Sequence, residues 1–78
     1  MNDALQENLQ IFEEFVTSSD YGQIVCIAKE DHTVSNFLDD ISLRYESIKF
    51  FIDTDMQRAV DESHVLASMI CDYLGYDQ

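Results

Sequence analysis

Two short apolar runs, residues 24–28 and 48–52, constrain the fold more than any other feature of the sequence. The first run reads IVCIA and the second IKFFI. Both are rich in β-branched or aromatic residues, which favour strands. Amphipathic segments surround the two runs, as in a sheet that is covered by helices. The sequence therefore predicts that each run is a buried strand of a parallel sheet.

Three segments have the apolar spacing of amphipathic helices, at residues 3–16, 34–47 and 56–74. Phe12, Ile41 and Ile70 are central in the three apolar faces, and we expect them in the core. In the first segment the apolar face comprises Leu5, Leu9, Phe12 and Val16, and it is widened toward one side by Phe15, Ala4 and Ile11. Residues suited to cap these helices stand at their ends: Asn2 or Asp3, Asp31 or Thr33, Thr54 or Asp55, and Gly75.

The predicted order is α-β-α-β-α in a single acidic α/β domain, residues 1–78. A strand, a crossover helix and a second strand form a right-handed parallel βαβ unit. In a sheet of only two strands, each strand is an edge strand, and one row of its backbone N–H and C=O groups has no hydrogen-bond partner. We therefore expect the sheet to be completed by a homodimer, by a partner's strand, or by a third strand elsewhere in the chain.

Residues 10–55 are expected to follow the order helix, buried strand, polar loop and helix, and they end with IKFFIDTD and its acidic turn. This order resembles the first half of a thioredoxin-like domain. The family's redox cysteines, separated by two residues, would fall at residues 30–34, which contain no cysteine, and the chain has no proline for the family's cis-proline. The resemblance therefore implies a redox-inactive adaptor that binds a partner.

The net charge is the feature of the sequence that says most about function. The chain has 16 carboxylates and only four basic residues, so its net charge is −12. Affinity for nucleic-acid phosphates and for anionic membranes comes from Lys and Arg, so we expect neither as a direct partner. A basic protein would be attracted over about a Debye length. The charge also exceeds the magnitude of about 2–8 that solubility of a small domain requires.

The residues that could carry catalysis or bind a metal are the cysteines, the histidines and one pair of aspartates. Cys26 and Cys71 are expected to be buried thiols, and two cysteines do not make a disulfide scaffold, which favours the cytoplasm. His32 and His64 are expected on the surface, without zinc-site spacing. The pair Asp53 and Asp55, which would follow the second strand, is the one candidate for Mg²⁺ and phosphate chemistry.

The sequence thus predicts a non-enzymatic interaction protein without cofactor or metal. In type it resembles the small acidic inhibitors that phages and mobile elements direct at nucleic-acid-handling proteins. We expect it to act as an acidic inhibitor or nucleic-acid mimic that binds a basic groove of such a protein. Leu43, an apolar residue on a polar face, is expected to give specificity. The expected partner-binding residues are Asp3, Glu7, Glu14, Asp39, Leu43 and Glu46. The alternatives are the redox-inactive adaptor and a Mg²⁺-dependent phosphate enzyme that uses Asp53 and Asp55.

Overall fold

The computed structural model describes residues 3–75, and in this part of the chain the regular structure is entirely helical. Four helices follow one another: α1 (Asp3–Thr17), α2 (Tyr21–Ala28), α3 (His32–Thr54) and α4 (Met56–Leu74). No strand occurs among these residues. The predicted α-β-α-β-α order and the α/β class are therefore wrong.

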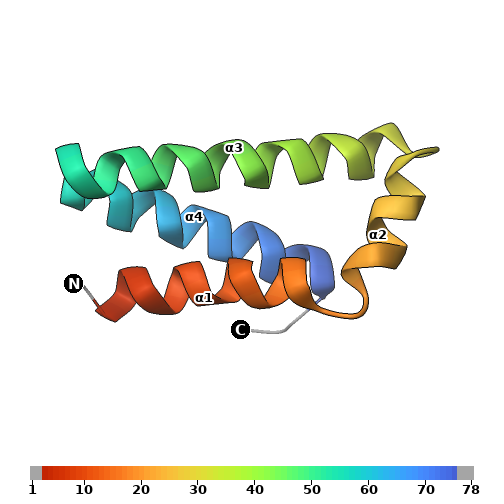
Figure 1. Cartoon of the computed structure of the whole chain (residues 1–78), viewed down its shortest axis with the longest axis horizontal. Coiled ribbons are helices and arrows are strands. Elements are labelled where there is room, and N and C mark those ends of the chain that lie inside the picture. Colours follow the sequence, from red (N-terminus) through yellow and green to blue (C-terminus); the bar gives the residue numbers. More distant parts are fainter. Residues whose placement is uncertain (1–2, 76–78) are drawn as a thin grey trace.

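The three longer helices lie side by side along the 37 Å length of the molecule, and α2 closes one end (Figure 1). α3 and α4 form an antiparallel hairpin in which Asp55 alone connects the two helices. α4 packs against both α3 and α1, and α1 and α4 run in the same direction. α1 and α3 consequently form opposite edges of the bundle in this view.

Residues 48–52 are the last turns of α3 and not a separate strand. Ile48 is fully buried, whereas Lys49 and Phe50 are exposed, as expected where neighbouring residues point in different directions around a helix. The apolar stripe of α3 continues without a break across the predicted boundary at residue 47. Its members are spaced alternately four and three residues apart: Val34, Leu38, Ile41, Tyr45, Ile48 and Ile52.

Residues 24–28 lie in the short helix α2 and not in a strand that is buried on both faces. Only Ile24 is buried, while Cys26 is exposed and Ile27 is 51% exposed. The scale of strand propensities spans only about 1 kcal/mol between residue types, and the preference of β-branched residues for strands depends on context. Packing of α2 against the first half of α3 outweighs this preference.

Three expectations depended on those strands and are corrected with them. The described residues contain no βαβ unit, and they present no strand edge through which a homodimer would form. The part of the chain that resembles a thioredoxin-like domain, residues 10–55, adopts helices where that family has strands. The adaptor hypothesis therefore loses its structural basis.

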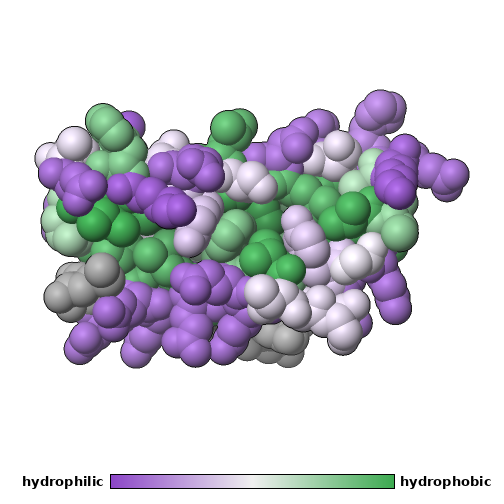
Figure 2. All heavy atoms as spheres, viewed as in Figure 1, coloured by the Kyte–Doolittle hydropathy of each residue, from purple (hydrophilic) through white to green (hydrophobic). Residues whose placement is uncertain are grey.

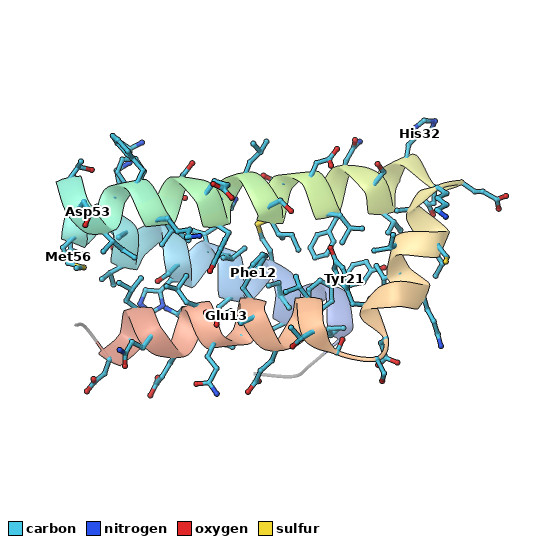
Figure 3. The ribbon with its side chains drawn as sticks, viewed as in Figure 1. Phe12, Glu13, Tyr21, His32, Asp53 and Met56 are labelled. Atoms are coloured by element: carbon cyan, nitrogen blue, oxygen red, sulfur yellow. The ribbon has the colours of Figure 1, made fainter. Side chains whose placement is uncertain are left out.

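The core confirms the residues placed at the centre of each apolar face. Ile41 and Ile70 are fully buried, and Phe12 is 8% exposed. The Phe12 ring stacks on Tyr45 of α3, with ring centroids 4.2 Å apart and an interplanar angle of 17°. Figure 3 shows Phe12 inside the bundle, so α1 faces the core as the sequence predicted.

The buried face of α1 lies toward the Phe15 side of the predicted apolar face. Its buried residues are Leu5, Asn8, Phe12 and Phe15, whereas Leu9 and Val16 are only half-buried. This side is buried because α1 contacts all three other helices, and Phe15 meets Phe37 of α3 edge-on with ring centroids 6.3 Å apart. Asn8 is the one buried residue of α1 that lies outside the predicted apolar face.

The helix ends follow the predicted capping chemistry. The Asp31 carboxylate accepts hydrogen bonds from the backbone N–H groups of Thr33 (2.9 Å) and Val34 (3.4 Å) at the start of α3. Asp55 accepts from the N–H of Arg58 (3.3 Å) and caps α4. Gly75 ends α4 with a φ of 77°, a left-handed conformation that glycine adopts readily. Asp3 is the first described residue of α1, and Asn2 lies outside the described residues.

Candidate interaction surface

The acidic row predicted on the first helix lies on the outer edge of α1. Asp3, Glu7 and Glu14 are all exposed there, and Figure 2 shows hydrophilic side chains gathered along this edge. Gln10 lies between them in the heptad spacing 3, 7, 10, 14 and donates its Nε2–H to Glu14 Oε1 at 3.0 Å. This edge of α1 is wholly polar.

The second predicted face lies on the outer side of α3, turned away from the buried stripe of that helix. Asp39, Leu43 and Glu46 are all exposed there. Leu43 is 68% exposed, so the sequence correctly predicted an apolar residue in contact with water. Its exposure removes any role for Leu43 in the core.

Two further residues of this face were missed because the helix was expected to end at residue 47. Phe50 is 64% exposed, and Asp53 is exposed in the last turn of α3. Continuing the spacing 39, 43, 46 gives 50 and 53, so the periodic pattern itself contained the signal. We call the five residues the α3 outer stripe: Asp39, Leu43, Glu46, Phe50 and Asp53. Apolar side chains project from this edge of the molecule in Figure 2.

The structure does not bring the two acidic faces together. α1 and α3 form opposite edges of the bundle in Figure 1, across a dimension of 23 Å. A flat partner therefore meets only one of the faces at a time. Of the two, only the α3 outer stripe combines carboxylates with exposed apolar side chains.

Arg44, Lys49 and Arg58 contact side chains outside both faces. Within residues 3–75, Arg44 alone forms ion pairs, with Glu62 at 2.8 Å and Asp40 at 3.6 Å. Lys49 Nζ lies 5.1 Å from the ring centroid of Tyr45, and the Arg58 guanidinium stacks over Phe51 at 4.6 Å. Among the described residues, no basic side chain forms an ion pair with the carboxylates of the α3 outer stripe.

Asp53 and Asp55 do not stand at the end of a strand, where the magnesium site was predicted. Both are exposed at the α3–α4 turn, at the opposite end of α3 from His32 (Figure 3), and the strand that was to align them is absent from the described residues. Asp55 is used as the α4 cap. No group of three His, Cys, Asp or Glu side chains within residues 3–75 is arranged to hold a metal ion.

A polar cluster between α1 and α4 was not predicted. Asn8 Nδ2 donates to Ser63 Oγ at 3.1 Å and lies 3.2 Å from His64 Nδ1. Ser63 Oγ in turn donates to the Val60 carbonyl at 2.7 Å, which occupies its only proton. The serine is fully buried and no described contact joins it to the histidine, so the cluster lacks the nucleophile–base contact of a hydrolase. In coiled coils, a single buried asparagine specifies the register of the paired helices.

A groove runs beside this cluster between α1 and α4. Its larger hollow, of about 380 Å³, has an apolar floor that includes Ile11, Phe15 and Leu74. Cys71 is half-buried in the wall of this groove, whereas Cys26 is exposed on α2, so the expectation of two buried thiols is wrong for Cys26. Both thiols are free. His32 and His64 are exposed, as expected.

Comparisons of the chain with protein-family models, with curated proteins and with solved structures find no match. None of the four helices combines the length and apolar character that crossing a membrane requires. The exposed carboxylates and exposed apolar side chains of the bundle are therefore the features that bear on its function.

Proposed function

We propose that this protein is a non-enzymatic interaction protein that binds a basic surface of a nucleic-acid-handling protein in the cytoplasm and inhibits it by excluding nucleic acid. The observation that carries the proposal is the exposure of carboxylates along opposite edges of a folded bundle, with few basic residues to neutralise them. Such a field attracts Lys- and Arg-lined surfaces and raises the association rate.

The shape of the molecule sets the scale of this attraction. A net charge of −12 over a length of 37 Å gives roughly one charge per 3 Å. DNA carries about one charge per 3.4 Å for each strand and about one per 1.7 Å for the duplex. The charge density thus resembles that of a single strand, and it supports competition for a basic surface more than imitation of a complete duplex.

The proposal is tested by affinity capture at two salt concentrations, about 50 mM and 500 mM. We expect the protein to retain basic nucleic-acid-binding proteins at low salt and to release them at high salt, because screening removes the attraction between exposed charges. A purified captured protein should then lose its nucleic acid when this protein is added. Retention that is unchanged at high salt, or a captured protein that keeps its nucleic acid, would contradict the proposal.

The matched control is a variant in which both acidic faces are neutralised by amide substitutions that preserve size. It carries these changes: Asp3→Asn, Glu7→Gln, Glu14→Gln, Asp39→Asn, Glu46→Gln and Asp53→Asn. All six positions are exposed, so the fold should be retained. Loss of capture by a folded variant supports the electrostatic mechanism, and undiminished capture refutes it.

A further inference from the structure

The exposed apolar residues of α3 stand out among the surface features of the bundle. Leu43 and Phe50 are the two most exposed large apolar side chains among the described residues, at 68% and 64%. They are seven residues apart on one helix, which places them about 10.5 Å apart along its axis at 1.5 Å per residue. A polar residue at either position would avoid contact between apolar surface and water.

The carboxylates of the α3 outer stripe repeat with the same period. Asp39, Glu46 and Asp53 are also seven residues apart, and they alternate with the two apolar residues. The stripe thus reads as an acidic, apolar, acidic, apolar, acidic pattern that extends over two heptads. A seam with a seven-residue period is the type of surface on which two α-helices pack side by side.

From this arrangement we infer that the α3 outer stripe is a docking site for a basic amphipathic helix of a partner protein. The partner helix presents one apolar residue per heptad to Leu43 and Phe50, and Lys or Arg residues between them to the carboxylates. A helix fits because its own residues at positions i and i+7 have the same 10.5 Å spacing as the two anchors. This inference rests on the proposed function and specifies where the basic partner binds.

Charge complementarity selects the occupant. A second copy of this chain would place Asp39, Glu46 and Asp53 against the same carboxylates, and like charges at close range repel. The two nearest basic residues of α3, Arg44 and Lys49, are held by Glu62 and Tyr45 away from the stripe. The outer edge of α1 offers carboxylates but no exposed apolar anchor, so it attracts a partner without fixing its position.

The test measures binding of synthetic helical peptides of three heptads by titration calorimetry at about 50 mM and 500 mM salt. The probe peptide carries one Leu per heptad, flanked by Lys. One control peptide has Glu in place of Lys, a second has Gln in place of Leu, and a third has central prolines that prevent helix formation. We expect binding of the probe peptide and at least tenfold weaker binding of all three controls.

Variants of the protein locate the site. Leu43→Ala and Phe50→Ala should each weaken binding of the probe peptide roughly tenfold, as truncation of a central apolar anchor does. The matched control is Ile27→Ala with Val65→Ala, which truncates exposed apolar residues on α2 and α4 and should change affinity less than twofold. The α3 charge variant (Asp39→Asn, Glu46→Gln, Asp53→Asn) should weaken binding more than the α1 variant (Asp3→Asn, Glu7→Gln, Glu14→Gln), which removes equal charge.

The outcomes separate this inference from the proposed function. If the probe peptide binds in a salt-dependent way but the α3 substitutions have no larger effect than their controls, the docking site is wrong and the electrostatic function stands. If no Lys-containing peptide binds at low salt, both are wrong. Equal binding of the proline-containing peptide overturns the helical partner. Self-association that Leu43→Ala abolishes overturns the basic partner in favour of a second copy.

Discussion

Substitutions of Ser47 test whether α3 is one continuous helix. Ser47 is exposed in the middle of this helix, immediately before the run that resembles a strand. Proline at this position removes the N–H that donates to the carbonyl four residues earlier, and its ring clashes with that carbonyl. The cost in a helix interior is about 3 kcal/mol.

The magnitude of this cost is large for so short a chain. At about 0.05–0.15 kcal/mol per residue, 78 residues give a free energy of unfolding of roughly 4–12 kcal/mol. A loss of about 3 kcal/mol corresponds to a fall in Tm of roughly 12–24 °C, at 4–8 °C per kcal/mol for domains of this size. Thermal unfolding followed by far-UV circular dichroism measures the shift directly.

A graded series at the same position provides the control. Ser47→Ala should raise the free energy of unfolding by about 0.5 kcal/mol and Ser47→Gly should lower it by a similar amount, because the order follows helix propensity. In a loop between a helix and a strand, this order has no physical reason. If Ser47→Pro melts within a few degrees of the unmodified protein, the continuous α3 is refuted.

Three other substitutions test the packing and capping. Phe12→Ala should lower the free energy of unfolding by about 3–5 kcal/mol, because it removes the ring stacked on Tyr45; an unchanged Tm would show that α1 does not pack through Phe12. Asp31→Ala should cost about 1 kcal/mol in urea unfolding by removing the α3 cap, and no change would mean that the cap does not stabilise the helix. Asn8→Ala should cost about 1–3 kcal/mol in the same assay, since buried Ser63 loses its donor; a neutral effect would contradict the role of this hydrogen bond.

The sequence predicted the amphipathic helices and their caps better than the elements between them. The apolar periodicity identified Phe12, Ile41 and Ile70 as core residues, and all three are buried. Asp31 and Asp55 were each predicted as one of two possible caps, beside Thr33 and Thr54, because Asp and Thr side chains both accept hydrogen bonds at a helix start. These features depend on local chemistry that a sequence displays directly.

The strand predictions for residues 24–28 and 48–52 are wrong because β-branched and aromatic residues also occur in helices that are buried by packing. Residues 48–52 continue the buried stripe of α3 in register, and no glycine or proline separates them from the helix before. Residues 24–28 form a helix through packing against α3, a tertiary contact that no local pattern displays. For short apolar runs, helix and strand are not distinguishable by local periodicity.

The candidate surface was predicted in part for the same reason. Asp39, Leu43 and Glu46 were identified within the expected helix and are exposed together on α3. Phe50 and Asp53 were assigned to a strand and its turn, so their place in the same stripe was missed. That the α1 and α3 faces lie on opposite edges follows from the order in which the helices pack, which the sequence does not display.

The most direct test of the account is to map binding of the Lys- and Leu-containing helical peptide by two-dimensional NMR of the isotope-labelled protein. We predict that the largest amide shift changes fall at Asp39, Leu43, Glu46 and Phe50 and that they weaken at 500 mM salt. Amides along the outer edge of α1 should shift little. Changes centred on the α1–α4 groove, at Ile11 and Phe15, or on the outer edge of α1, would contradict the assignment of the partner to α3.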